Sequence, residues 1–275
     1  MGGHAASTSI AGARLTPPSS TSELRDTSAS AHAVPRRTLL TVAAVGAAAF
    51  MAVYIGVGSW VVRADLPQHT LATPLDGRLP LMPSAMLLYG LLYGQILAPL
   101  AYITDRRVMW RAGAGCVSLF VVSVPVWIVW PVTMPRVEVP VTDTLSWGLA
   151  LMRYLDPPTN CFPSLHVAES FFAALVVRRH DRPVGDLMLG FGVAIWASTL
   201  LLGQHWVVDG VAGLALALAA DHWFLGRRPL PPAAWRGGRR RWLWIPVGAY
   251  GLAFVLFALP WWLGLEAVIR VVMGG

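Results

Sequence analysis

The chain has 275 residues, of which 56% are hydrophobic and only 13% are charged. Soluble domains carry about 25% charged residues, so this composition excludes an ordinary soluble domain and favours an integral membrane protein. The net charge of +7 comes from arginine alone, because the 21 basic residues include no lysine. The arginines form short clusters between apolar runs, a pattern that indicates membrane topology and predicts no nucleic-acid partner.

Apolar runs along the chain predict seven membrane helices. Residues 1–37 are rich in Ala, Ser, Thr, Gly and Pro without apolar periodicity, so they are expected to form a disordered cytoplasmic tail. The run after Arg37 is about 25 residues long, whereas a signal peptide has a core of only ~7–15 apolar residues, so it predicts an uncleaved first helix. Six more helices are expected, at 84–103, 112–131, 165–177, 186–203, 206–224 and 243–264.

These elements predict an all-α, polytopic integral membrane helix bundle. Residues 38–224 hold a six-helix core, and residues 225–275 hold a basic cytoplasmic loop and an extra, seventh transmembrane helix. With the tail in the cytoplasm, sixteen arginines face inward and five face outward, as the positive-inside rule expects. The outward ones are Arg63, Arg78, Arg136, Arg153 and Arg270. The lysine-free composition, rich in Ala, Gly, Arg and Pro, indicates a bacterial plasma (inner) membrane.

In this topology the loops 63–83 and 132–164 and the turn at 203–205 lie on the outer side. Loop 132–164 is long for a simple connection, and loops of such length are more often functional or disordered. It contains the segment LSWGLALMRYL, which fits an amphipathic helix lying in the membrane interface.

Polar residues cluster where two of the predicted helices begin at this outer face. The stretch NCFPSLHVAES opens the 165–177 run with His166, and QHWVVDG places His205 and Asp209 four residues apart at the start of the 206–224 run. On a helix, residues four apart lie on one face. A carboxylate that accepts a proton from one imidazole nitrogen leaves the other free as a base, ligand or nucleophile. Two histidines and one carboxylate therefore suit a nucleophile, its orienting group and a general acid.

Other interpretations of the same residues remain open. A lone interfacial histidine is more often structural, and Asp209 can be a helix cap. His205 with Asp209 can also be half of a metal site, although the H-E-x-x-H pattern is absent. A transporter or a non-catalytic lipid-binding scaffold would use the three side chains as a proton relay, but the sequence shows no internal repeat of the kind many transporters have.

Two motifs resemble the sequence signatures of a known family and occur in the same order along the chain. PSLH at 163–166, followed by STLLLGQHWVVD at 198–209, resembles the P-S-x-H and S-R-x5-H-x3-D signatures of the type-2 phosphatidic acid phosphatase superfamily. The resemblance covers about residues 38–224, and the variant FPSLH is similar to the inositol phosphorylceramide synthase branch. It implies that His205 is a nucleophile that forms a phosphohistidine, that Asp209 orients it and that His166 protonates the leaving group. It also implies that Ser164 gives the phosphate a hydroxyl or backbone donor.

The chain departs from the family pattern in its positive charges. Thr199 stands where the common signature has arginine, and the K-x6-R-P signature is absent. Arg136 and Arg153 are the candidates to bind the phosphate instead. Asn160 and Glu169 complete the candidate substrate-binding residues, with Glu169 able to bind a headgroup hydroxyl or to pair with an arginine.

The missing cations bear on the substrate. A phosphomonoester carries about −1.5 to −2 charges near neutral pH, whereas a phosphodiester carries one. The predicted function is therefore transfer of a lipid-linked phosphoryl or headgroup-phosphate moiety, for example from phosphatidylinositol, to a hydroxyl acceptor. The alternative is a phosphatase for a lipid phosphate or polyprenyl pyrophosphate, with water as acceptor. Neither a metal nor an organic cofactor is expected, and the substrate is a phospholipid or polyprenyl phosphate in the membrane.

Overall fold

The computed structural model describes residues 32–235 and 244–265. Most of the predicted tail, the basic run RGGRRRW and Arg270 lie outside the described residues. The described part of the chain is helical and contains no β-strand, which confirms the all-α prediction. Arg36 and Arg37, at the end of the predicted tail, form the first turn of the first described helix.

The helices follow one another with few long connections. In chain order they are α2 (Arg36–Arg63), η1 (Asp76–Arg78), η2 (Pro83–Ala85), α3 (Met86–Tyr89), α4 (Leu91–Leu97), α5 (Pro99–Tyr102), α6 (Arg106–Val129), α7 (Thr144–Leu155), α8 (Leu165–His180), α9 (Arg182–Leu201), α10 (Val207–Ala220), the π-helical turn η3 (Asp221–Gly226), η4 (Pro232–Trp235) and α11 (Trp244–Trp262).

Within residues 32–235 and 244–265, six segments are long and apolar enough to cross a membrane, which supports a multi-pass membrane protein. They are 36–63, 83–102, 106–129, 182–201, 207–226 and 244–262. One helix was expected at 84–103, but this part of the chain is broken into η2, α3, α4 and α5. Pro99 begins α5, and because proline has no backbone N–H it interrupts the helical hydrogen-bond ladder.

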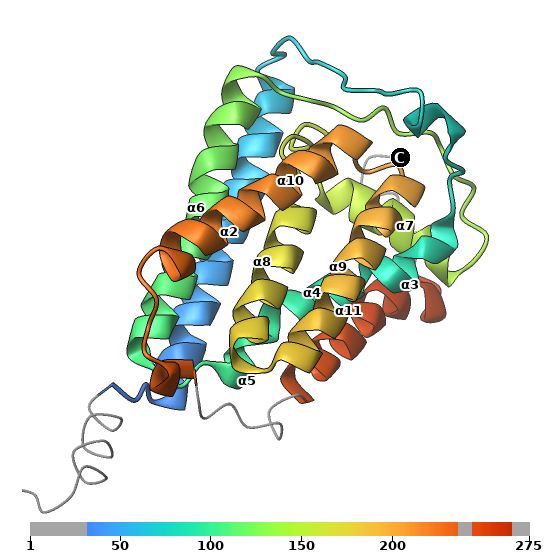
Figure 1. Ribbon diagram of the computed structural model, residues 1–275. Coiled ribbons are helices and arrows are strands. Elements are labelled where there is room, and N and C mark those ends of the chain that lie inside the picture. Colours follow the sequence, from blue (N-terminus) through green and yellow to red (C-terminus); the bar gives the residue numbers. More distant parts are fainter. Residues whose placement is uncertain (1–31, 236–243, 266–275) are drawn as a thin grey trace, which may run out of the picture.

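Helix α8 lies at the centre of the bundle (Figure 1). It packs against α4, α6, α9 and α10, and most of its residues are buried. A helix that is apolar on nearly every side is expected to be buried in this way. At 16 residues it is shorter than the six membrane-spanning segments, and it extends three residues past the predicted end at 177.

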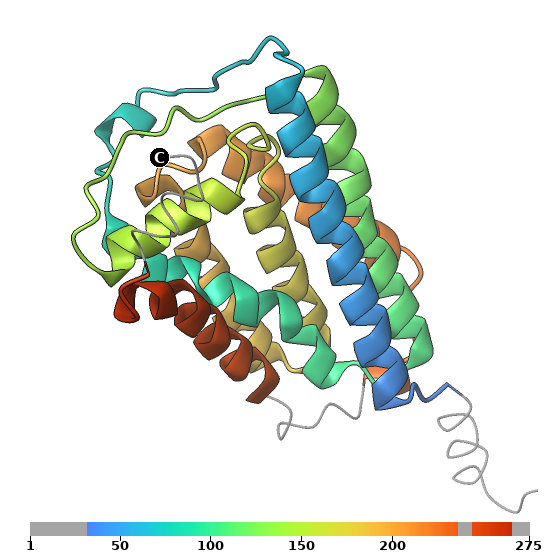
Figure 2. The same cartoon turned by 180° about the vertical axis from the view of Figure 1, so that it is seen from behind.

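Helices α2 and α6 pack side by side at one edge of the bundle, and α11 packs on α4 and α7 at another (Figures 1 and 2). We call the end of the bundle that holds the C-terminal ends of α2, α6 and α9 and the N-terminal ends of α8 and α10 the loop end. It carries the loops 64–82 and 130–143 (Figure 1). The candidate catalytic residues gather at this end.

The predicted helix in loop 132–164 is present as α7. Its N-terminus carries a capping box in which Asp143 accepts from Ser146 N–H at 2.9 Å, while the Ser146 side chain accepts from Asp143 N–H at 3.0 Å. Its buried face includes Trp147, Leu149 and Met152 and packs near α3 and α11. The loop is therefore part of the packed structure at the loop end.

Candidate active site

His205 and Asp209 are brought together by the start of α10. His205 comes just before that helix, and Asp209 lies in its first turn. Nδ1 of His205 is 3.3 Å from Oδ2 of Asp209. The same oxygen accepts a hydrogen bond of 2.8 Å from the backbone N–H of Trp206, and a negative charge at a helix N-terminus is favoured by the helix dipole. Asp209 is therefore held against one ring nitrogen of His205, and the other nitrogen faces α8.

His166 reaches the same point from the first turn of α8. Its Nδ1 is 3.0 Å from Nε2 of His205, and its Nε2 is 2.8 Å from the hydroxyl of Tyr89 on α3. Tyr89 and His205 are each 3% exposed, and Asp209 is fully buried. We call Tyr89, His166, His205 and Asp209 the two-histidine cluster. Three separate helices contribute to it.

One set of neutral tautomers satisfies every contact in the two-histidine cluster. Tyr89 O–H donates to Nε2 of His166, Nδ1–H of His166 donates to Nε2 of His205, and Nδ1–H of His205 donates to Asp209. These proton positions follow from the hydrogen-bond network. They give His205 a lone pair and His166 a proton at the point where the two rings meet.

The segment before α8 ties this helix to α10. Ser164 caps α8, because its Oγ accepts from Val167 N–H at 3.4 Å. Its backbone N–H donates to the carbonyl of Asp209 at 3.1 Å. A Cβ on Gly213 of α10 would lie 2.4 Å from the carbonyl oxygen of Ser164, so only glycine allows this approach. The close contact sets the spacing between the two histidines.

Asn160 lies in the same segment and binds α2. Its Nδ2 donates to the carbonyl of Tyr54 at 3.1 Å. Its Oδ1 is buried and has no hydrogen-bond partner among the described residues. The structure thus gives Asn160 a bracing contact and one acceptor still available.

Arg136, from the loop after α6, lies beside the two-histidine cluster. Its Nη2 is 3.4 Å from Oε1 of Gln204, the residue before His205, and 3.7 Å from Oδ2 of Asp156. Its Nη1 donates to the carbonyl of Arg153. Within the described residues, Nε of Arg136 and Nε2 of Gln204 are buried donors without an acceptor. Two donors next to His205 are therefore available to an anion.

Asp156 is the counter-charge of Arg136. Its Oδ1 accepts a hydrogen bond from the hydroxyl of Tyr54 on α2. Burial raises the pKa of Asp156 above its ordinary value, although the Tyr54 hydrogen bond and the charge of Arg136 act in the opposite direction. Asp156 thus pairs with Arg136 and is held in place by the hydroxyl of Tyr54.

Arg153, a predicted phosphate-binding residue, donates to backbone carbonyls. Its Nη1 donates to the carbonyl of Val137 at 2.6 Å, and its Nη2 donates to the carbonyl of Leu202 at 2.7 Å. Leu202 precedes Gly203, which has a φ of +60° and forms the turn that leads to His205. Glycine adopts this left-handed conformation without steric cost. Arg153 therefore joins the loop after α6 to the turn that carries the candidate nucleophile.

Glu169 and Thr199 do not join this group. Glu169 is half-buried in α8 and makes no hydrogen bond or ion pair with any described residue. Thr199 is fully buried, and its hydroxyl donates to the carbonyl of Trp196 at 2.7 Å. The position that carries arginine in the family signature is thus occupied by a hydroxyl bonded within its own helix.

Among the described residues, the one group with the side-chain types of a metal site is Cys161, His205 and Asp209. Their possible ligand atoms lie within 4.8 Å of one another. However, Nδ1 of His205 faces Asp209 itself, and the Cys161 thiol donates to the carbonyl of Pro158 at 3.1 Å. The observed contacts favour a hydrogen-bonded pair rather than a set of ligands pointing at a common centre.

Four side chains at the site were given no role from the sequence: Tyr54, Tyr89, Asp156 and Gln204. Gln204 adjoins His205 in the recognised motif, so its position was a usable signal. Asp156 follows a predicted amphipathic helix, where an acidic residue by itself gives no signal of function. The two tyrosines lie within apolar runs, where aromatic residues are usually packing residues.

Comparison with known proteins identifies a family for this chain. A family model for the PAP2 superfamily, the type-2 phosphatidic acid phosphatases, matches residues 67–223. The branch similar to inositol phosphorylceramide synthase is not distinguished by this match. A segment of 57 residues is 39% identical to the uncharacterized protein MJ0662 of Methanocaldococcus jannaschii and covers 21% of this chain and 23% of that protein. No solved structure matches the chain.

Proposed function

Because the chain belongs to the PAP2 superfamily, whose chemistry is that of phosphatases and phosphotransferases, we propose that it transfers a lipid-linked phosphoryl or headgroup-phosphate moiety to an acceptor hydroxyl. The observation that carries the proposal is the direct contact between His166 Nδ1 and His205 Nε2, with Asp209 behind His205. It sets a nucleophile against an acid, as transfer through a covalent intermediate requires.

The first half-reaction begins with Nε2 of His205. This nitrogen attacks the phosphorus of the lipid, and the P–O bond to the leaving group breaks. His166, which takes up a proton when the anionic phosphate binds, gives its Nδ1 proton to the departing oxygen and is left as the neutral imidazole. Asp209 accepts the hydrogen bond from the His205 ring and stabilises the positive charge that the ring gains on becoming a phosphohistidine.

The second half-reaction returns the residues to their starting state. The acceptor hydroxyl attacks the phosphorus and gives its proton to Nδ1 of His166, and the N–P bond to His205 breaks. Because the rings are in contact without substrate, the phosphoryl group has to separate them when it binds. Tyr89 contacts the opposite side of the His166 ring and keeps Nδ1 facing the reacting group.

Arg136 and Gln204 are the residues we assign to the phosphate oxygens. Each has a buried donor without an acceptor among the described residues. Arg153 donates to two carbonyls, and Thr199 carries no charge, so the positive charge near His205 is smaller than the family signature supplies. A substrate with one negative charge on phosphorus, a phosphodiester, fits this balance better than a monoester. This argument favours transfer over hydrolysis.

We place the loop end on the extracytoplasmic side of a bacterial inner membrane, with the N-terminus in the cytoplasm. The excess of arginine on the opposite side supports this orientation. Residues 38–224 would then form the catalytic core, with residues 225–275 as an addition to it.

The test uses the purified full-length protein in detergent. It receives phosphatidic acid, a polyprenyl pyrophosphate, or phosphatidylinositol with a lipid alcohol, while mass spectrometry follows the lipids and free phosphate is quantified. We expect a new headgroup-bearing lipid without free phosphate. Release of phosphate from the monoester or pyrophosphate would instead establish a phosphatase.

Two variants control this experiment. His205→Ala should remove all turnover, because it removes the proposed nucleophile. His69→Ala changes a loop-end histidine whose ring lies against that of Trp130 and should retain turnover. Activity that survives both His205→Ala and His166→Ala would rule out the mechanism. A folded wild-type protein without activity on any of the lipids would favour a binding scaffold or transporter.

A further inference from the structure

A groove lies between α7 and the loop that follows α6. Its volume is about 280 Å³, close to the lower limit of roughly 300 Å³ for pockets that bind small molecules. Three charged side chains line it, those of Arg136, Glu138 and Arg153. The other lining residues are Val137, Val139, Leu149, Ala150 and Tyr154. All of them lie outside the six membrane-spanning segments, so the groove is placed at the level of lipid headgroups rather than of hydrocarbon chains.

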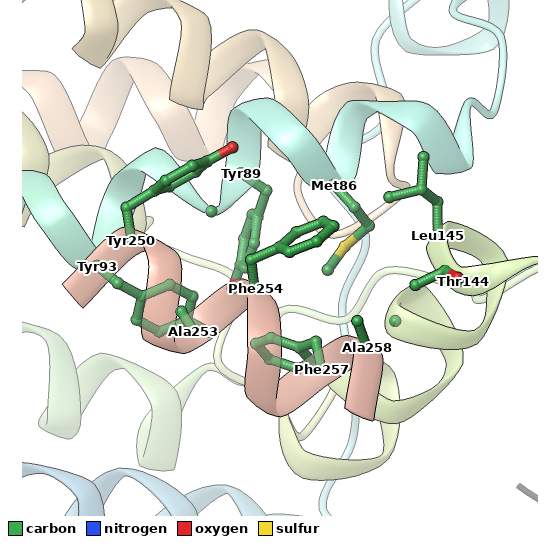
Figure 3. Close-up of a pocket in the computed structure, with 12 residues that line it drawn as sticks. Met86, Tyr89, Tyr93, Thr144, Leu145, Tyr250, Ala253, Phe254, Phe257 and Ala258 are labelled. Carbon is green, nitrogen blue, oxygen red and sulfur yellow. The ribbon is translucent and has the colours of Figure 1, made fainter. Parts of the chain in front are cut away.

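The pocket between α11, α7 and the segment formed by α3 and α4 has a different character (Figure 3). Figure 3 shows Phe254 and Phe257 of α11 on one side, facing Met86 and Tyr89 of α3. No charged side chain lines this pocket, and its volume is about 20 Å³, which is room for about one water molecule. Of the two spaces, only the groove is large and polar enough for a lipid headgroup.

The groove adjoins the reacting residues through the segment 202–204. Nη2 of Arg153 donates to the carbonyl of Leu202 at 2.7 Å, and Nη2 of Arg136 is 3.4 Å from Oε1 of Gln204. His205 is the next residue of the chain. Because Arg136 belongs both to the groove and to the proposed phosphate site, a substituent on a phosphorus bound there can extend into the groove.

The reaction proposed above keeps one part of the substrate at the site throughout. When Nε2 of His205 attacks the phosphorus, the P–O bond to the lipid alcohol breaks, and the headgroup stays bonded to phosphorus until the acceptor hydroxyl attacks. The leaving alcohol and the acceptor both carry hydrocarbon chains and remain in the bilayer. The headgroup is polar and needs a site outside the bilayer core, which is where the groove lies.

The donors and acceptors of the groove match hydroxyl groups. Arg153 donates two of its five N–H groups to backbone carbonyls, so it retains N–H groups for a ligand. Glu138 is exposed, and an ionised carboxylate only accepts hydrogen bonds. A hydroxyl both donates and accepts, so a headgroup with several hydroxyls satisfies Arg153 and Glu138 together. An ammonium group offers Arg153 no acceptor and repels both arginines, whereas a carboxylate or phosphate group offers Glu138 no donor.

We propose that this groove binds the headgroup of the lipid phosphodiester, and that the headgroup is uncharged and carries several hydroxyl groups. The proposal rests on the proposed function, because it takes the substrate to be a lipid phosphodiester that reacts at His205. Arg136 contacts the phosphate, and Arg153 and Glu138 contact the hydroxyls. The groove thereby selects among phosphodiester lipids by their headgroup.

Four phosphodiester lipids with identical acyl chains test the proposal. The full-length protein in detergent receives phosphatidylinositol, phosphatidylglycerol, phosphatidylethanolamine or phosphatidylmethanol, each with the same lipid alcohol as acceptor. Phosphatidylmethanol carries the phosphodiester charge but has only a methyl group to place in the groove. We expect kcat/KM for the two hydroxyl-bearing lipids to exceed that for phosphatidylmethanol by about 10- to 100-fold, the scale of a hydrogen bond to a charged group. Phosphatidylethanolamine should react no faster than phosphatidylmethanol.

Matched variants separate the groove from the rest of the loop end. Ala150→Leu narrows the groove and should lower the ratio of kcat/KM for phosphatidylinositol to that for phosphatidylmethanol by about tenfold or more. Glu138→Gln removes the acceptor charge and should lower the same ratio by less. Ala52→Leu, at an exposed position of α2, and Asp65→Asn, at an exposed position of the loop after it, should keep the wild-type ratio. Thermal unfolding of each variant checks that the fold is retained.

The outcomes distinguish this proposal from the proposed function. Equal kcat/KM for all four lipids, a preference for phosphatidylethanolamine, or a ratio unchanged in Ala150→Leu would overturn the headgroup proposal and leave the proposed function standing. Native mass spectrometry of His205→Ala protein measures lipid retention without turnover. Selective retention of the hydroxyl-bearing lipids that Ala150→Leu abolishes, with no turnover by wild-type protein, would keep the headgroup site and reject the reaction.

Discussion

The imidazoles of His166 and His205 touch across two helices, with Nδ1 of the first 3.0 Å from Nε2 of the second. The two residues are 39 positions apart in the chain, and the contact exists because α8 and α10 approach closely at the loop end. Each ring has a partner on its other side, Tyr89 for His166 and Asp209 for His205. Five predictions follow from the way these partners and their neighbours are held.

Replacing Asp209 by asparagine should reduce kcat by about 10³-fold or more. The amide can donate to Nδ1 of His205, which favours the tautomer with the proton on Nε2 and removes the nucleophilic lone pair. Loss of an orienting carboxylate behind a catalytic histidine lowers kcat about 10⁴-fold in a known hydrolase. Steady-state kinetics checks this. Asp76→Asn is the control, since Asp76 accepts from Val207 N–H at the start of the same helix without touching a histidine. An equal loss in both variants would contradict the orienting role.

Replacing Tyr89 by phenylalanine should lower kcat by about 10- to 100-fold for a lipid with a poor leaving group, the scale of a positioned hydrogen bond to a charged group. The loss should shrink with a nitrophenyl leaving group, because that group leaves without needing a proton. Tyr102→Phe, at the other end of the same segment, is the matched tyrosine control. A loss independent of the leaving group would assign Tyr89 to packing alone.

The two outer arginines should respond differently to replacement by alanine. Arg136→Ala should reduce kcat/KM about 10- to 100-fold, because it removes a charged donor from the proposed phosphate site. Arg153→Ala should mainly lower Tm, because it removes the hydrogen bonds to Val137 and Leu202. Kinetics and thermal unfolding of the same two preparations distinguish the roles. Identical behaviour of the two variants would show that this division is wrong.

Asp156→Asn should flatten the dependence of stability on pH. The raised pKa of Asp156 means that its protonated form stabilises the fold below the ordinary value of about 3.9. That contribution is lost as pH rises through the raised pKa of the folded state. Tm measured from acid to alkaline pH should therefore fall more for wild type than for the variant. Glu138→Gln, at an exposed loop position, should keep the wild-type profile. An Asp156→Asn profile that runs parallel to the wild-type profile would refute the assignment.

Gly213→Ala should destabilise the protein and impair turnover together. The new Cβ would meet the Ser164 carbonyl at 2.4 Å, so α10 must move away from α8, at a cost of about 1–3 kcal/mol for an overpacked contact. The movement also separates His205 from His166. Gly190→Ala in α9, whose Cβ would have open space, should be neutral or slightly stabilising. Thermal unfolding and activity are measured on both, and a stable, fully active Gly213→Ala protein would contradict the close packing.

Much of the architecture could be predicted because a membrane helix can be identified from its own residues. A run of apolar residues long enough to cross a bilayer is visible in the sequence whatever lies beside it, so the all-α fold and the approximate span limits were accessible. The pairing of His205 with Asp209 could be predicted for the same reason, because they are four residues apart and local helix geometry places them together. The spacing within 163–166 and 198–209 also carried the family resemblance.

What the sequence could not determine are contacts between distant residues. Tyr89 meets His166 across 77 positions, and Asn160 meets Tyr54 across 106. The same limit applies to Arg153, which donates to the carbonyls of Val137 and Leu202, because charge and spacing alone do not give the partners of a side chain.

By itself, then, the sequence determined the helices, the two motifs and the chemistry that their side chains permit. Only the tertiary structure decided which side chains complete that chemistry: Tyr89 behind His166 and Asp156 beside Arg136. The physical reason is that a helix specifies its own backbone hydrogen bonds within four residues, whereas the partner of each side chain depends on which helix packs against it and how closely.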